Sequence, residues 1–174
     1  ICKTEIERIK QYISEGRLWE LLEQRSRSHP SLFKAFKTLC KYSEYLERET
    51  PSYKRRGILI FEETSLRRPE VLRYKKKLKN YRQPKGVKNL LLLPEPDSKP
   101  FHSSSQYKKV ERIIGLQSNF HVCFYSIPFG VIPIELDEVY PLSQYETCPP
   151  FSYEMKKDLA ESIKQYIKSK KYDK

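Results

Sequence analysis

The chain has 174 residues, and its 34 lysines and arginines against 22 aspartates and glutamates give a formal net charge of +12. This length suits one ordinary domain or two small ones and excludes a complete (β/α)8 barrel of about 250 residues. No apolar run approaches the roughly 18 residues that cross a bilayer, and no signal-like segment opens the chain, so we expect a soluble, cytoplasmic protein without a membrane partner. Because the sequence opens on Ile1 within a helical pattern, we do not expect Ile1 to be the biological start.

The positive charge lies almost entirely in the first half of the chain. Residues 1–85 hold 22 basic and 11 acidic side chains, whereas residues 86–174 hold 12 and 11. An excess of this size is typical of proteins that bind a polyanion, nucleic acid before membrane. The second explanation is stability, because many thermophilic proteins are rich in lysine and glutamate.

Cysteine and histidine usage argues against a disulfide scaffold and against a zinc site within this chain. The cysteines lie far apart without a CxxC pair, and the three histidines do not stand at ligand spacing from them. We therefore expect free thiols in a reducing compartment, with Cys40 and Cys123 in apolar surroundings. The other two are Cys2 and Cys148.

Helical patterns fill the first fifty residues. Residues 4–15 and 17–28 each place apolar side chains on one face, and Gly16 between them stops or bends the first helix. Pro30 at a first helical position starts a third helix, which is predicted to run to residues 50–51 with an apolar core stripe that reaches Leu46.

A short strand is predicted at residues 58–61, followed by a helix that begins at Pro69 and turns Val71 and Leu78 inward. The other face of this helix and the residues after it hold seven cations within thirteen residues and no acid. Two tyrosines are interleaved, so we weigh contact with an RNA phosphate backbone evenly against a plain solvated face. The seven candidate RNA-binding residues are Arg73, Lys75, Lys76, Lys77, Lys79, Arg82 and Lys85.

The pattern changes after a linker at residues 83–86, where we place a domain boundary. Strand, helix, strand and helix patterns follow, with the two strands expected to be parallel through a crossover. The sequence thus predicts a mixed α/β (α+β) fold, made of a helical part (1–85) and a small α/β domain (86–174). The predicted elements are a strand at 87–93, a helix from 103–105 to Gly115, a strand at 120–126 and a helix at 153–168.

The stretch from Phe120 to Glu146 is predicted to be a strand followed by a buried, irregular crossover. Four prolines and glycines punctuate it, yet its side chains stay apolar, which a solvated loop would not show. Such a segment must satisfy its backbone polar groups internally, so it is expected to be kept for its shape.

No catalytic centre is visible in the sequence. Glycine-rich phosphate loops, GxSxG and HExxH are all absent. The acids Glu135, Asp137 and Glu138 are expected to be surface groups with basic neighbours, because adjacent residues do not share a face. Lys99 with the serines at 103–105 could bind an anion at a helix N-terminus, but an ordinary serine cap explains them as well.

Three long motifs carry a family resemblance. GRLWELLEQRSRSHPSL (16–32), SLRRPEVLRYKKKL (65–78) and FHVCFYSIPFGVIPIELDEVYPLSQYE (120–146) together resemble the archaeal tRNA-guanine transglycosylases, which replace guanine in the D-arm of tRNA with preQ0 during archaeosine synthesis. The similarity covers essentially the whole chain.

The resemblance implies that the chain is part of a longer cytoplasmic enzyme. Residues 1–85 would correspond to the closing helices of a TIM-like catalytic barrel and their extension, and residues 86–174 to the first C-terminal domain, with an RNA-binding PUA module after it. The family's two catalytic aspartates and its zinc site lie upstream, so no residue here is assigned as catalytic or metal-binding. The implied partner is tRNA, which this part would hold as a scaffold, and a homodimer through the full-length protein is open.

Two alternatives stay open. The first is an archaeosine synthase-like tRNA-modification protein, whose family pattern resembles residues 94–107 around Lys99-Pro100-Phe101, although this chain lacks the pattern's cysteine and final histidine. The second is a stand-alone RNA-binding module, which the helices without a complete core of their own disfavour.

Overall fold

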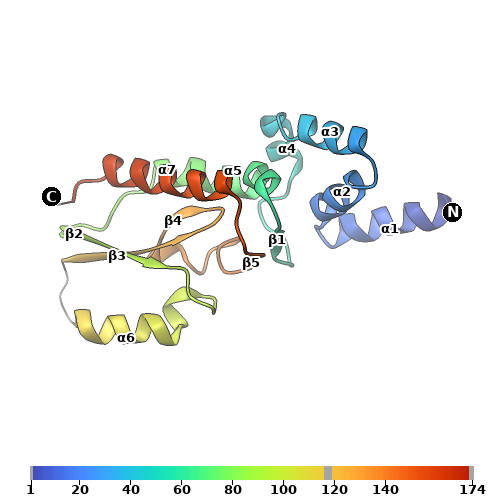
Figure 1. Cartoon of the computed structure of the whole chain (residues 1–174). Helices are drawn as coiled ribbons and strands as arrows, with labels where there is room; N and C mark the ends of the chain where they lie inside the picture. The colour runs from blue at the N-terminus through green and yellow to red at the C-terminus, as the bar shows by residue number, and fades with distance from the viewer. Residues whose placement is uncertain (1, 116–118, 173–174) are drawn as a thin grey trace.

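A computed structural model describes residues 2–115 and 119–172 of the chain. Four helices come first and lie to one side of the remaining structure (Figure 1). Gly16, with φ of +70°, separates the first two as predicted. The four are α1 (Cys2–Ser14), α2 (Leu18–Ser26), α3 (Pro30–Leu39) and α4 (Ser43–Glu49).

The prediction of one long third helix is wrong, because the chain breaks between α3 and α4. Phe36 and Leu46 both pack on the cluster that surrounds Trp19, and the Trp19 and Phe36 ring centroids are 5.3 Å apart. In one straight helix these two side chains would be about 15 Å apart along the axis, too far to share one tryptophan. The break brings both of them to the same small core.

The rest of the chain forms a three-layered α/β structure. Helix α6 (Ser105–Ile114) lies on one side of the sheet β2-β3-β4, and α5 (Pro69–Lys79) and α7 (Tyr153–Ser169) lie on the other (Figure 1). The predicted parallel pairing of the two strands around α6 is confirmed, with Asn89 opposite Phe120 and Pro94 opposite Tyr125. The strands are β2 (Asn89–Pro94), β3 (Phe120–Ser126) and β4 (Gly130–Pro133).

The stretch after β3 is more regular than predicted. β4 pairs antiparallel with β3, with Phe124 opposite Ile132, and only the one-turn helix η3 (Ile134–Leu136) follows before the chain crosses to the second sheet. Its proline and glycine content suggested an irregular crossover, but Gly130 with φ of +85° closes a tight hairpin.

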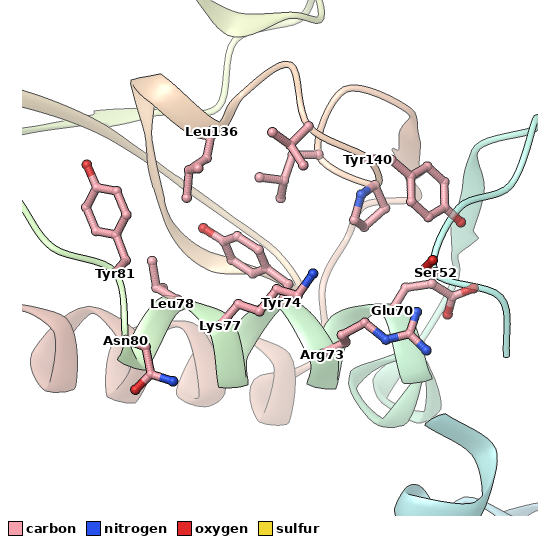
Figure 2. Close-up of a pocket in the computed structure, with 13 residues that line it drawn as sticks. Ser52, Glu70, Arg73, Tyr74, Lys77, Leu78, Asn80, Tyr81, Leu136 and Tyr140 are labelled. Atoms are coloured by element: carbon pink, nitrogen blue, oxygen red, sulfur yellow. The ribbon is translucent and has the colours of Figure 1, made fainter. Parts of the chain in front are cut away.

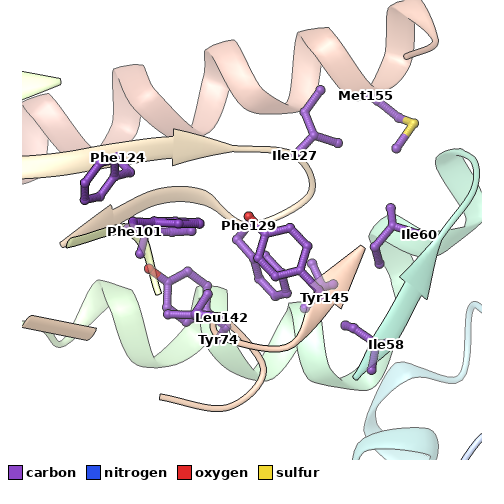
Figure 3. Close-up of a cluster of buried hydrophobic side chains, with 12 residues drawn as sticks. Ile58, Ile60, Tyr74, Phe101, Phe124, Ile127, Phe129, Leu142, Tyr145 and Met155 are labelled. Atoms are coloured by element: carbon purple, nitrogen blue, oxygen red, sulfur yellow. The ribbon is translucent and has the colours of Figure 1, made fainter. Parts of the chain in front are cut away.

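A second, two-stranded sheet joins the two halves of the sequence. β1 (Ile58–Ile60) pairs in parallel with β5 (Tyr145–Thr147), so that Ile58 lies opposite Tyr145. The main core combines Ile58 and Ile60 with side chains from α5, β3 and the segments around them (Figure 3). The hydrophobic core therefore does not divide at the boundary predicted between residues 85 and 86.

Gly130 offers a test of how tightly α7 packs on the hairpin. A Cβ at Gly130 would lie 2.7 Å from the Ser162 Cβ, whereas a Cβ at Gly86, which has the same φ of +85°, would have nothing within 4 Å. We expect Gly86→Ala to lower the free energy of unfolding by about 1–2 kcal/mol through backbone strain alone. Gly130→Ala should add about 1–3 kcal/mol for overpacking, as measured by urea denaturation. Equal losses in the two variants would mean that α7 moves aside freely.

A buried group of charges anchors the start of α5. Arg68, immediately before the helix, is 0% exposed; its Nη1 lies 2.9 Å from Glu20 Oε1 and donates to the Leu59 carbonyl at 3.2 Å. Lys54 Nζ lies 2.5 Å from Oε1 of Glu70, and Arg68 Nε lies 3.5 Å from its Oε2. Burial alone would raise the pKa of the Glu70 carboxyl, but Arg68 and Lys54 outweigh it and hold that pKa below its usual value. This network ties α2, the β1 region and α5 together.

Glu23 lies beside this network, but its pKa is shifted in the direction opposite to that of Glu70. It is 3% exposed, and its Oε1 accepts a hydrogen bond from the Thr64 hydroxyl at 2.9 Å. Burial raises the pKa of Glu23 above its ordinary value of 4.5 and outweighs the hydrogen bond from Thr64. The folded state therefore holds the Glu23 proton more tightly than the unfolded chain does.

The raised pKa of Glu23 predicts a pH-dependent cost. The contribution of this carboxyl to stability is largest below pH 4.5 and is lost as the pH rises through the raised pKa. In Glu23→Gln that loss is absent, so we expect the unfolding free energy of the variant relative to the natural protein to increase between pH 4 and pH 8. Urea denaturation across this range checks it, with Glu44→Gln at an exposed position as the control. A difference that stays constant with pH would contradict it.

Candidate RNA-binding surface

The seven candidate cations divide into two groups. Arg73 donates to the carbonyls of Glu47, Thr50 and Pro51, which lie at and after the end of α4. Lys75 Nζ lies 2.5 Å from Asp158 Oδ2 on α7, and Lys76 Nζ lies 2.5 Å from Glu47 Oε2. These three side chains therefore hold α5 against its neighbours. We no longer expect them to be the main contacts with RNA.

The other four candidates face solvent. Among residues 2–115 and 119–172, none of them has an acidic side chain within ion-pair distance. Charges that stay unpaired on one surface repel one another and attract a polyanion. The four are Lys77 and Lys79 on α5, and Arg82 and Lys85 in the linker that follows.

The end of α7 adds cations that are not among the seven candidates. Gln83 binds Lys171 twice, through its Nε2 to the Lys171 carbonyl at 2.8 Å and from the Lys171 amide to its Oε1 at 3.0 Å. Lys170 donates to the Tyr81 carbonyl. A surface hollow of about 410 Å³ results, whose cationic lining is Arg82, Lys85, Lys170 and Lys171. We call Lys77, Lys79 and these four the basic surface.

A polar cluster around the buried His121 fixes the linker beneath this surface. His121 is 1% exposed; its Nδ1 lies 2.6 Å from the Tyr172 hydroxyl, and its ring stacks on Tyr81 with centroids 6.0 Å apart. The Tyr81 hydroxyl donates to Glu135 Oε2 at 3.0 Å. Burial would raise the pKa of Glu135, but hydrogen bonds from His121, the backbone and Tyr81 lower it below its usual value. The segment beneath the basic surface is thus held in place by these hydrogen bonds and by the stacked rings.

Two of the other sequence hypotheses receive structural answers. Lys99 Nζ lies 2.7 Å from Glu95 and 4.0 Å from the Tyr145 ring centroid, while Ser104 caps α6 by accepting the Tyr107 amide at 3.1 Å. The serine cap therefore explains this segment, and the Lys99 ammonium is held by Glu95 and the Tyr145 ring.

The expectation that Asp137 is a surface acid is wrong. It is 2% exposed, and its carboxylate accepts the His102 amide at 2.8 Å and lies 3.0 Å from the His102 ring. It satisfies the backbone of the turn before α6, which a sequence cannot reveal because the two residues are far apart.

The cysteines agree with the prediction of free thiols. All four are free, and Cys40 and Cys123 are buried. Burial raises the pKa of Cys40 to about 11 and that of Cys123 to about 12, so both stay protonated at neutral pH. Within the described residues, no three metal-binding side chains gather closely enough to hold an ion. No helix built from those residues is long and apolar enough to cross a membrane.

A family model with the description "Domain of unknown function (DUF5591)" matches residues 71–174, which is more than half of the chain. The chain belongs to the DUF5591 family. The matched range holds α5 from Val71 onward, the linker, the whole β2-β3-β4 sheet and α7, and it contains every residue of the basic surface.

Curated archaeal relatives match beyond the DUF5591 range. A tRNA-guanine(15) transglycosylase of Methanocaldococcus jannaschii is 38% identical over 86% of this chain and 21% of its own length. Proteins of the same name from Methanosphaera stadtmanae and Saccharolobus solfataricus are 38% and 32% identical, over 99% and 98% of this chain and 27% and 34% of their own lengths. The chain thus spans about a fifth to a third of the curated relatives that it matches.

Proposed function

We propose that this chain is the tRNA-holding part of a tRNA-guanine(15) transglycosylase and that it acts in the cytoplasm. The main support is that relatives of that name match almost the whole chain, in their C-terminal part, at 32–38% identity. The base exchange itself would be carried out by aspartates, with zinc as a structural metal, on the remainder of the protein. No step of that chemistry is assigned to residues of this chain.

The basic surface supports the tRNA-holding role. An enzyme that modifies a base within a folded tRNA must expose that base and hold the rearranged backbone, and this needs phosphate contacts outside the catalytic site. Exposed lysines and arginines without acidic partners provide such contacts at low cost, because they give up no ion pair within the protein. The three paired cations on α5 keep the helix in place beneath them.

The exposed face of α1 supports a place within a larger protein. Ile6, Ile9 and Ile13 are 52%, 39% and 56% exposed and lie on one side of a helix without a buried residue. Apolar side chains in a row on a soluble helix usually belong to an interface. We propose that this face packs on the catalytic part of the enzyme, and that any homodimer forms through the parts of the enzyme outside this chain.

The experiment that tests the proposed function is a salt titration of tRNA binding. We expect the chain to bind an archaeal tRNA transcript, with the logarithm of the association constant falling linearly with the logarithm of the salt concentration by about 0.7–0.9 per phosphate contacted. Base-paired RNA hairpins of equal charge serve as the comparison. Absence of binding at 50 mM salt, or binding to tRNA and hairpin with equal affinity, would contradict a tRNA-holding role.

A further inference from the structure

A pocket of about 310 Å³ lies next to the basic surface. It is formed by one side of α5, by the segment 136–142 between η3 and β5, and by Ser52 (Figure 2). This volume falls at the lower end of the range of small-molecule sites. Its walls are mostly apolar, and they include the rings of Tyr74, Tyr81 and Tyr140.

One end of the pocket holds buried polar atoms that form no hydrogen bond with any residue that the structure describes. Figure 2 shows the Tyr140 hydroxyl, Ser52 and the Glu70 carboxylate at this end. Among the described residues, neither the Tyr140 hydroxyl nor Glu70 Oε2 makes a hydrogen bond, although both atoms are buried and Arg68 Nε lies 3.5 Å from Glu70 Oε2 as an ion pair. Glu70 as a whole is 2% exposed. Buried oxygens left in this way destabilise a protein unless a ligand or an ordered water satisfies them.

The charge state of these two groups is defined. Burial raises the pKa of the Tyr140 hydroxyl, and the nearby Glu70 charge raises it further, so Tyr140 is neutral at physiological pH. Glu70 is a carboxylate for the reason given above and can only accept hydrogen bonds. This end of the pocket thus combines one strict acceptor with one hydroxyl that can donate or accept.

A cation lies at the pocket without an acidic partner among residues 2–115 and 119–172. Lys77 lines the pocket, is exposed, and belongs to the basic surface. Arg73 also lines it, but its guanidinium is held by three backbone carbonyls at the end of α4. A phosphate near the pocket mouth would therefore be bound by Lys77.

We propose that this pocket receives one unstacked base of a bound RNA, with the base between tyrosine rings, its amino edge at Glu70 and Tyr140, and its phosphate at Lys77. Protein sites that read RNA sequence work on unstacked bases in this way, through aromatic faces and hydrogen bonds to base edges. The inference rests on the proposed function, because it requires that the basic surface holds RNA.

The carboxylate predicts which bases fit. Guanine presents an N–H and an amino group side by side, and adenine and cytosine each present an amino group. Uracil flanks its single N–H with two carbonyl oxygens, which would face the carboxylate and be repelled. The expected order of preference is guanine, then adenine and cytosine, then uracil.

The test uses fluorescently labelled heptanucleotides of uridine whose central base is guanine, adenine, cytosine or uracil, titrated with the natural protein and three variants. Val139→Trp fills the pocket from a position that is 53% exposed. Tyr140→Phe removes only the unpartnered hydroxyl. Lys79→Ala removes a cation of the basic surface that does not line the pocket.

We expect the natural protein to bind the guanine-centred probe roughly 5- to 100-fold more tightly than the all-uridine probe, the discrimination that one well-formed set of hydrogen bonds to a base edge provides. Val139→Trp should abolish this preference without weakening all-uridine binding, and Tyr140→Phe should reduce it. Lys79→Ala should weaken all probes equally. Thermal unfolding checks that each variant is folded. If Val139→Trp does not fold, Tyr140→Phe tests the pocket inference.

The outcomes separate this inference from the proposed function. If the natural protein binds no RNA, the proposed function and the pocket inference both fail. If it binds RNA without base preference, or if Val139→Trp and Tyr140→Phe keep the preference unchanged, only the pocket inference is overturned, and the buried oxygens are then satisfied by water alone.

Discussion

Arg68→Met is expected to lower the free energy of unfolding by about 3–5 kcal/mol, because it leaves the buried Glu20 carboxylate without its cation and leaves Glu70 with Lys54 alone. Glu20 and Glu70 are 8% and 2% exposed, and both lie within ion-pair distance of the Arg68 guanidinium. The variant also removes the stacking of that guanidinium 5.5 Å from the Trp19 ring. A domain is stable by only about 5–15 kcal/mol in total, so urea denaturation should place the variant close to unfolding.

The neighbouring Arg67 supplies the matched control. It is exposed, and among residues 2–115 and 119–172 no acidic side chain lies within ion-pair distance of it. Arg67→Met should change stability by no more than about 0.5 kcal/mol. Adding Glu20→Gln to Arg68→Met should recover part of the loss, since the uncompensated charge of Glu20 is then gone, whereas Glu70 still pairs with Lys54. Equal effects at positions 67 and 68 would mean that the buried network contributes nothing.

The second large effect is expected on tRNA binding. Replacing Lys77, Lys79, Arg82 and Lys85 together by alanine should weaken binding by at least about tenfold at low salt. The slope of the logarithm of the association constant against the logarithm of the salt concentration should become shallower by about 3. The reason is that a phosphate which no longer meets a protein cation keeps its counterions. Fluorescence anisotropy of labelled tRNA over a range of potassium chloride concentrations measures both quantities.

Two comparisons define what this variant means. Replacing Lys34, Lys41, Lys108 and Lys109 by alanine removes the same charge from exposed positions on α3, α6 and the turn after α3, and should leave the slope almost unchanged. Lys75→Ala with Lys76→Ala should also change the slope little, because these lysines face Asp158 and Glu47. If all three variants flatten the slope equally per charge removed, net charge and not the basic surface governs binding.

Local elements could be predicted from the sequence, whereas long-range partners could not. Pro69 and Ser104 mark the starts of α5 and α6 because capping and proline geometry act over a few residues. β1 and β5 are only three residues each and pair across 87 positions, from Ile58 to Tyr145. Three apolar residues carry no information about which distant strand they join.

The candidate site was predictable in outline for the same reason. The run of cations on and after α5 is visible in the sequence, but their partners are not. Lys75 pairs with an acid 83 residues away, and Lys76 with one 29 residues away. Likewise nothing local distinguishes the buried Arg68 from the exposed Arg67. The pocket beside Lys77 is formed by three separate segments of the chain, so no single sequence motif could predict it.

The pairing of β1 with β5 sets a limit on how far the protein can be shortened. A recombinant fragment cut at residue 71, where the family match begins, would discard Ile58 and Ile60 from the interior and leave the edge of Tyr145–Thr147 open to strands of other molecules. Such a fragment is expected to precipitate on expression. Crystallisation trials and ligand screens should therefore start the polypeptide well ahead of residue 58, even though the recognised family range begins later.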